Sequence, residues 1–475
     1  MTAETIYELT VEAPPGDLIA YDPIRLASAL RIEDPSRLAI ETDGMNHALV
    51  TIYPSDPLAD VELPDPSELV MDDQGRIWVG RYHNGRPARM RLYDPRAGSA
   101  QRGLLFGTTG AGKSTGLQVI LAAEKRSGIV TFLSDLKGGQ SVPEARDNVD
   151  WFVTTPEGAM AQLRTVWLIM QARQVRYAAA GRSKFLMNRP DPLLNLRIDE
   201  ANRLLEKGAP FRDEATYYIK DIGRTGRSLG IGVHLSAQAG HLEELGGSDT
   251  LRGMLKDGEV ILLRWTSTMM RQLVSDGLLA AGQSLAPIPK YAGAIKLISQ
   301  FEEAGDEDAP GTQGSGYLLS GPSPTSRFRF FNVGSTEPVE GLDPEMLALY
   351  GDGPVRQLEK ESLDDAGDAY AGRLDGPEAY AAIFPMEEED EDGEGSGGGG
   401  GRKSGGKKRP VAPGPAMPEP SKPRARTLAE RVQAVLENSD GDLDAAAILE
   451  AVNADGDRQV RLGSVRNTLT ALKSN

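Results

Sequence analysis

The sequence has no cysteine among its 475 residues and no apolar run of membrane-spanning length. The first absence excludes disulfides and thiolate metal sites, and the second argues against a helix that crosses a bilayer. The amino terminus also lacks the basic-then-apolar pattern of a secretory signal. We therefore expect a cytoplasmic protein without stable membrane insertion.

Positive charge is scarce as well: 52 Lys and Arg stand against 69 Asp and Glu, which gives a net charge of −17. Contacts to phosphate need Lys and Arg, so nonspecific nucleic-acid binding over the whole surface is excluded. Any DNA contact must be local. The length is sufficient for two or three domains that include a large α/β core.

A glycine-rich loop organises the sequence. It spans residues 107–114, matches G-x-x-x-x-G-K-[ST], and lies between a strand predicted at 104–106 and a helix predicted at 115–126. Only glycine lets the backbone wrap a triphosphate closely, and the following helix directs its positive dipole end at the phosphates. We predict that ATP binds here, in contact with Gly107, Thr108, Thr109, Gly110, Ala111, Gly112, Lys113, Ser114 and Thr115.

A second motif supplies two acids. An apolar strand predicted at residues 193–198 ends in Asp199 and Glu200, the pattern called Walker B. Lys113 is expected to reach the β- and γ-phosphates, and Ser114 and Asp199 to hold Mg²⁺. Glu200 is expected to orient the water that attacks the γ-phosphate.

Further candidates follow two other predicted strands. The strand at residues 231–238 ends in Gln238, which we expect to sense the γ-phosphate. Arg224 and Arg227 precede that strand and are either solvated helix charges or arginines that act in trans on a neighbouring subunit's ATP. Asp135 and Lys137 end a strand predicted at 128–134, either near the nucleotide or ring centre, or as a charged turn.

These motifs occur in a fixed order: GTTGAGKST, SDLKGGQ, LRIDEAN, GRTGRSLGIGVHLSAQ, LKDGEVILLRW and GSGYLL. In this order, over about residues 76–333, they resemble the FtsK/SpoIIIE/HerA superfamily of ring-shaped motors. The most similar branches are FtsK-type DNA translocases, TraB-like DNA transfer ATPases of actinobacterial mobile elements, and EccC ATPases of type VII secretion. The resemblance implies a RecA-like α/β motor domain that assembles as a hexamer around double-stranded DNA and moves along it with ATP.

The sequence departs from this pattern in three ways. FtsK and TraB proteins carry an N-terminal membrane anchor that is missing here, which suggests a soluble version from a mobile element or phage. EccC proteins string several motor domains together, whereas this chain has one. The family places an arginine early in the strand that reads here as residues 259–264, but this chain has only Arg264 near its end. The trans-acting arginine is therefore open among Arg224, Arg227 and Arg264.

Composition predicts four regions along the chain. Residues 1–75 form a small β-rich module, 76–336 the motor, 337–426 a flexible linker, and 427–475 a helical domain. The linker contains an acidic block, a glycine run and a stretch rich in Pro, Lys and Arg that cannot bury a core. His83 lies beside the turn of a predicted hairpin, where a solvated surface position is expected.

The last fifty residues read as three short helices that resemble a helix-turn-helix domain of winged-helix type. FtsK-type motors similarly end in a tethered winged-helix domain that reads DNA. The third helix, at residues 462–472, is the candidate reader, with Arg466 and Asn467 placed to meet base edges.

The sequence favours an ATP-dependent double-stranded DNA translocase whose tethered C-terminal domain chooses the site. One alternative is a motor of the same fold that moves protein, as in type VII secretion or conjugative coupling. Another is a nucleotide-switched DNA-binding adaptor, although the intact Glu200 speaks against slow hydrolysis and the tail speaks against a protein-moving motor.

Overall fold

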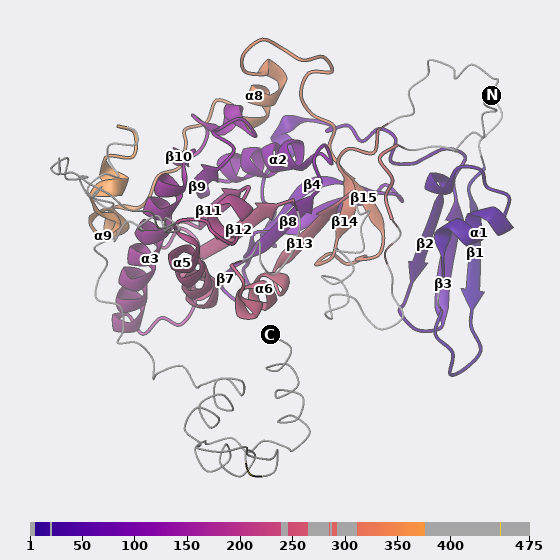
Figure 1. Ribbon diagram of the computed structural model, residues 1–475, viewed down its shortest axis with the longest axis horizontal. Helices are drawn as coiled ribbons and strands as arrows, with labels where there is room; N and C mark the ends of the chain where they lie inside the picture. Colours follow the sequence, from indigo (N-terminus) through magenta and orange to yellow (C-terminus); the bar gives the residue numbers. More distant parts are fainter. Residues whose placement is uncertain are drawn as a thin grey trace, which may run out of the picture. The chain divides into compact units, whose positions relative to one another are not determined.

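The computed structural model describes residues 5–19, 21–238, 246–264, 285, 287–291, 311–375 and 447. The chain divides into two compact units, residues 1–411 and 412–475. Within the first unit, a ten-stranded mixed sheet forms the centre, with helices on both of its faces (Figure 1). The predicted reader helix, with Arg466 and Asn467, lies outside the described residues, as does the linker from residue 376 to 426.

The sheet has the strand order β10-β9-β11-β12-β8-β13-β14-β15-β4-β5. The six strands from β10 to β13 run parallel, and the last four join antiparallel. The strands are β4 (Arg76–Tyr82), β5 (Pro87–Arg91), β8 (Gly103–Gly107), β9 (Val130–Asp135), β10 (Trp151–Val153), β11 (Leu194–Asp199), β12 (Ile231–Ala237), β13 (Glu259–Leu263), β14 (Ser315–Leu318) and β15 (Arg327–Phe330).

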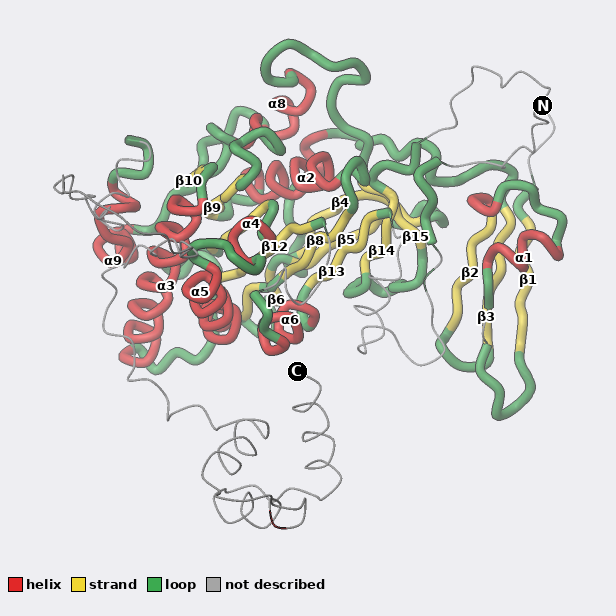
Figure 2. The backbone as a smooth tube through the Cα atoms, viewed as in Figure 1, coloured by secondary structure: helices red, strands yellow, loops and turns green. Residues whose placement is uncertain are grey.

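The direction of each crossover decides which face a helix covers. The connection from β8 to β9 runs one way along the sheet, whereas those from β10 to β11, β11 to β12 and β12 to β13 run the other way. Right-handed crossovers then place α2 (Lys113–Arg126) on one face and α3 (Pro156–Ala179), α5 (Arg212–Thr225) and α6 (Asp249–Lys256) on the opposite face. Figure 2 shows these helices in red on either side of the yellow strands.

The central strands form where the sequence has short, continuous apolar runs. Every residue of β8, β9, β11, β12 and β13 is buried, as expected for parallel strands covered on both faces. Helix α3 begins after Thr155, whose hydroxyl accepts from the Gly158 amide, and Pro156 occupies its first turn. Among the described helices, none is both long and apolar enough to cross a bilayer.

The first fifty residues form a separate three-stranded antiparallel sheet of order β1-β3-β2, with β1 (Tyr7–Glu12), β2 (Leu38–Thr42), β3 (His47–Ile52) and one helix, α1 (Pro23–Ala29). Shorter elements complete the first unit: β6 (Tyr93–Asp94), β7 (Ser99–Ala100), α4 (Asn202–Leu205), and the 3₁₀ turns η1 (Pro35–Arg37), η2 (Pro66–Glu68), η3 (Pro143–Ala145) and η4 (Gly226–Leu229).

The expectation of a solvated His83 is wrong. Its side chain is buried, with Nε2 3.6 Å from Glu41 Oε2 and its ring at an edge-on contact with Tyr53. Both partners come from the N-terminal residues, thirty or more positions earlier in the chain. The sequence around the turn therefore could not indicate that Glu41 and Tyr53 bury His83.

The expectation that the flexible linker starts at residue 337 is also wrong. Residues 337–375, here called the strap, contain α8 (Pro344–Tyr350), which packs on α2, and α9 (Lys360–Ala371), which packs on α3. The Tyr370 ring lies between Phe132 and Trp151 and is almost fully buried. The strap is thus part of the folded core, because Tyr370 packs on β9 and β10 and Tyr350 is buried beside α2.

Candidate active site

The phosphate loop joins β8 to α2 at the carboxyl edge of the parallel strands. Gly110 and Gly112 have φ of 74° and 90°, the left-handed region that favours glycine. A Cβ on Gly112 would stand 2.4 Å from the backbone nitrogen of Gly314, so no side chain fits there. Gly112 also precedes α2 without any side-chain cap, which leaves the amides of the first helical turn for another acceptor.

Lys113 lies between the two predicted acids. Its Nζ is 2.6 Å from Asp199 Oδ1 and 3.0 Å from Glu200 Oε1, although β12 separates β11 from β8 in the sheet. The parallel strands end at one edge, so residues 86 and 87 positions apart in sequence meet there. All three side chains are buried.

Lys113 and Asp199 shift each other's pKa in this buried cluster. Burial alone lowers the pKa of Lys113, but the carboxylates of Asp199 and Glu200 outweigh it and raise that pKa above its usual value. Burial raises the pKa of Asp199, and the adjacent ammonium opposes that rise. The Lys113 ammonium thus lies within hydrogen-bond distance of two carboxyl groups, and these contacts oppose the effect of its burial.

Glu200 carries a second contact and a strained backbone. Its φ of 52° is left-handed, which costs a non-glycine residue free energy and is common at functional positions. Gln238, directly after β12, donates from Nε2 to Glu200 Oε2 at 3.3 Å. Lys113 and Gln238 therefore hold opposite oxygens of one carboxylate, which fixes where the Glu200 side chain points.

Arg264 lies beside the phosphate loop of its own chain. Its Nη1 is 3.7 Å from the point where a Cβ on Gly110 would stand, and its guanidinium is buried. Burial lowers the pKa of Arg264. Nε donates to Thr312 Oγ1 at 3.3 Å, and Thr312 in turn donates to the Pro289 carbonyl. This placement favours a role in cis.

Arg224 and Arg227 lie near the amino ends of the parallel strands, opposite the end that carries the phosphate loop. Arg227 belongs to η4, which leads into the amino end of β12, and its Nε donates to the Ala100 carbonyl at 3.2 Å. Arg224 is exposed near the end of α5. The length of β8 and β12 separates both side chains from their own phosphate loop, so they remain the candidates for action in trans.

Asp135 stabilises the turn that follows β9. Its Oδ2 accepts from the amides of Ser141 and Val142 at 2.8 and 3.2 Å, and its Oδ1 accepts from the Lys137 amide at 3.1 Å. The Lys137 side chain is exposed. These contacts favour the charged strand-end turn among the two interpretations of this pair.

The loop of residues 311–315, next to β14, was missed as part of the site. Gly314 donates its amide to the Ala111 carbonyl at 2.8 Å, and its backbone fills the space beside Gly112. Thr312 from the same loop holds Arg264. The spacing of Gly311, Gly314 and Gly316 is the one sequence signal for this close backbone approach.

Donors suitable for a nucleotide and its metal ion converge here. Within the described part of the chain, buried Asp199 Oδ2 has no hydrogen-bond partner, while Ser114 occupies the first turn of α2. Gly110 and Gly112 of the same loop have no side chain that would keep a ligand away from the backbone. An oxygen-only pair of ligands that leaves the remaining positions to phosphates and water suits Mg²⁺.

No family model matches the sequence, and no curated protein matches it. Three solved structures share parts of the fold. The cytoplasmic domain of the type VII secretion ATPase EccC from Thermomonospora curvata has TM-score 0.43 and 20% identity, over 62% of this chain and 33% of that one. The conjugation coupling protein TcpA of pCW3, with ATPgS, has TM-score 0.45 and 16% identity, over 69% and 86%.

VirB4 of Thermoanaerobacter pseudethanolicus has TM-score 0.33 and 12% identity, over 58% of this chain and 100% of that one. The chain thus spans about a third of the EccC chain that it resembles. Likenesses this remote establish neither activity nor partners. The α/β fold rests on the strand order above, and the chemistry rests on the contacts of Lys113, Asp199, Glu200 and Gln238.

Proposed function

We propose that this protein is an ATP-dependent double-stranded DNA translocase that works as a hexameric ring and carries a DNA-reading domain in residues 427–475. The observation that carries the hydrolytic part is the contact of Lys113 with both Asp199 and Glu200, directly beside the glycine loop. This brings a phosphate-binding cation, a metal-binding carboxylate and a candidate base together at one point. The DNA part rests on the family resemblance of the ordered motifs.

In this proposal each side chain has one task. The loop amides and Lys113 bind the phosphates, and Arg264 neutralises charge on them from the same chain. Glu200 orients the attacking water through its carboxylate, which Gln238 holds in place. Ser114 and Asp199 would hold Mg²⁺, which supplies electrostatic stabilisation of the phosphate charge.

Gln238 links the nucleotide to the rest of the molecule. When Lys113 engages phosphates in place of the carboxylates, Glu200 loses one of its two partners, and the hydrogen bond from Gln238 becomes its main restraint. Gln238 follows β12 and immediately precedes residues 239–245. A change at the γ-phosphate would therefore reach the end of β12 through this hydrogen bond.

ATPase rates of the full chain with and without duplex DNA test this proposal. We expect duplex DNA to stimulate hydrolysis severalfold or more and single-stranded DNA to stimulate it less. Hydrolysis that no nucleic acid alters would favour the protein-moving motor, and DNA binding without turnover would favour the nucleotide-switched adaptor. A Lys113→Ala variant supplies the background rate in each arm.

A further inference from the structure

One outer face of the ten-stranded sheet, at its β4-β5 edge, carries a group of arginines around a tryptophan. In the antiparallel register of β4 and β5, Arg76 lies opposite Arg91 and Trp78 opposite Arg89. Alternate residues of a strand point to the same face, so these four side chains share one. Their neighbours Ile77, Ala88 and Met90 are buried on the other face.

A bulge extends the group. The register shifts between Trp78 and Gly80, so the extra residue brings Arg81 to the same face as Trp78. The Arg81 guanidinium lies 4.8 Å from the centre of the Trp78 ring, and Arg86 follows at the exposed hairpin tip. We call Arg76, Arg81, Arg86, Arg89 and Arg91 with Trp78 the arginine face.

The positive charge of the arginine face is only partly compensated. Arg76 pairs with Asp72 at 3.0 Å and Arg91 with Asp94 at 3.7 Å, both as local pairs on a partly exposed surface. Arg86 and Arg89 are exposed, and in the described ranges neither has a carboxylate within 4.0 Å. A chain with net charge −17 thus gathers five arginines on a single hairpin, although Arg86 lies near enough to Glu41 to help lower the pKa of that carboxyl.

The helices leave this face open. Helix α2 contacts β4 and β15 on the opposite side, where Phe330 packs against Gly116. On the side of the arginine face, α6 contacts β8 and β13. Arg86 and Arg89 are exposed there, whereas Arg76, Arg81 and Arg91 are half-buried.

We infer that the arginine face binds the sugar-phosphate backbone of duplex DNA. Guanidinium groups match phosphate oxygens through paired N–H donors, and such contacts hold a duplex without reading its sequence, as movement along DNA requires. Trp78 does not read bases, because its indole N–H donates to the Gly80 carbonyl at 2.6 Å. Its ring instead stiffens Arg81. The inference rests on the proposed function for its choice of DNA as the polyanion.

A salt titration of DNA affinity tests the charge contribution. The double variant Arg86→Ala/Arg89→Ala is compared with Arg25→Ala/Arg356→Ala, which removes two exposed arginines elsewhere and changes the net charge equally, from −17 to −17 − 2 = −19. We expect the first variant alone to lower affinity about ten- to thirtyfold near physiological salt and to reduce the slope of log K against log salt by about 1.8. Equal slopes in both variants would overturn the inference.

Cross-linking locates the contact directly, independently of binding by the tail. Because the chain has no cysteine, Arg89→Cys creates a unique attachment point for a photoreactive group, and Arg356→Cys is the matched control. We expect cross-links to a 40-base-pair duplex from position 89 and few from position 356. Cross-links from position 89 to the chain's own acidic block at residues 387–394, or none while the duplex is bound, would contradict the inference.

The two failures are distinguishable. If the unaltered chain binds no duplex and duplex leaves its ATPase rate unchanged, the proposed function is wrong. If the chain binds duplex and hydrolyses faster with it, but the arginine-face variants behave as their controls do, only the site is wrong. Basal ATPase rates of the Arg86→Ala/Arg89→Ala variant should equal those of the unaltered chain, since neither residue lies near the phosphate loop.

Discussion

The carboxylate of Glu200 is the point on which the candidate active site depends. It sits on a left-handed backbone, shares Lys113 with Asp199, and accepts from Gln238 on its other oxygen. A side chain held at both oxygens cannot choose among rotamers, so its position relative to the phosphate loop is set before substrate binds. That is the arrangement expected of a group that orients water.

Replacing Glu200 with glutamine separates binding from hydrolysis. Glu200→Gln keeps the shape but loses the base, so we expect ATP affinity within about threefold of the unaltered chain and turnover reduced by about 10²–10⁴. Nucleotide binding by fluorescence and phosphate release measure the two effects. The exposed Glu206 nearby allows a control, Glu206→Gln, which should leave both values unchanged. Unaltered turnover in Glu200→Gln would remove the assigned base.

Thr312 is predicted to act through Arg264. Thr312→Val deletes the hydroxyl that accepts from the Arg264 guanidinium, and the variant should lose about tenfold in kcat/KM for ATP. Thr312→Ser keeps the hydroxyl and should restore most of it. In a double-mutant cycle with Arg264→Ala, the two losses should not add, since one residue works by positioning the other. Additive losses would argue that Thr312 acts on its own.

His234 gives the protein a pH dependence of stability. Its ring lies in β12, is buried, and has no hydrogen-bond partner at either nitrogen within the described residues. Burial holds the pKa of this imidazole well below its usual value, and Arg197 lowers it further. Below about pH 6.5 the unfolded chain therefore takes up a proton that the folded chain does not, and stability falls by up to about 1.4 kcal/mol per pH unit.

Nuclear magnetic resonance checks this directly, because the chain has only four histidines. The His234 ring carbon signal should keep its neutral shift as the pH falls through the ordinary imidazole midpoint, about 6.5. A His234 signal that titrates near pH 6.5 in the folded protein would contradict the prediction.

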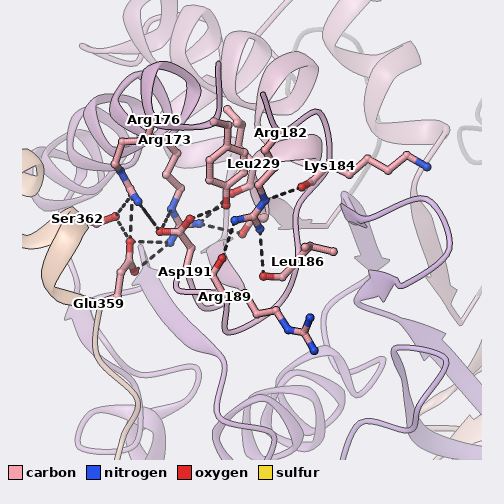
Figure 3. A network of polar contacts seen from close by, with 12 residues as sticks. Arg173, Arg176, Arg182, Lys184, Leu186, Arg189, Asp191, Leu229, Glu359 and Ser362 are labelled. Carbon is pink, nitrogen blue, oxygen red and sulfur yellow. Dashed lines mark hydrogen bonds and ion pairs between the residues drawn. The ribbon is translucent and has the colours of Figure 1, made fainter. Parts of the chain in front are cut away.

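At the scale of elements, the strap contacts parts of the described fold that are distant in sequence. The carboxylate of Glu359, just before α9, forms ion pairs with Arg173 and Arg176 of α3 (Figure 3). Arg176 also forms an ion pair with Asp191 at 3.0 Å. The Arg173 side chain is fully buried. Buried ion pairs of this kind fix a unique arrangement, because removing one partner leaves an uncompensated charge.

Tyr370 tests how much the strap contributes. Tyr370→Phe keeps the ring between Phe132 and Trp151 but removes the hydroxyl that donates to Asp150 at 2.7 Å. We expect the free energy of unfolding to fall by about 1–2 kcal/mol in a denaturant titration. The control Tyr217→Phe alters an exposed ring and should change it by less than about 0.5 kcal/mol. Equal stability of both variants would mean that the strap does not pack as described.

Sequence patterns anticipated the strands and helices that carry the motifs, and they failed where contacts are long-range. The helix predicted at residues 115–126 is α2, which begins two residues earlier at Lys113 and ends at the predicted residue, because the glycine loop marks its start. Tyr350 and Tyr370 gave no such signal, because their partners Gln118 and Asp150 lie more than two hundred residues away. The polar surroundings of the strap therefore resembled a linker.

The candidate active site likewise contains contacts that the sequence could predict and contacts that it could not. The contact of Lys113 with Asp199 follows from two motifs and a parallel sheet, so sequence could predict it. The place of Arg264 beside its own loop could not be predicted, because it depends on Thr312 and on the turn at Gly314 that follows β13 only after some fifty residues. Apart from the spacing of Gly311, Gly314 and Gly316, no motif or periodicity indicates this contact.

At the scale of the whole molecule, the account states that ATP hydrolysis moves this protein along duplex DNA. Displacement of a fluorescent triplex-forming strand from a long duplex measures that movement most directly. The account predicts displacement by the full chain with ATP, at a delay that grows with the distance from the binding site to the triplex, and none with Lys113→Ala. No displacement under conditions where duplex DNA stimulates hydrolysis, or equal displacement by Lys113→Ala, would contradict it.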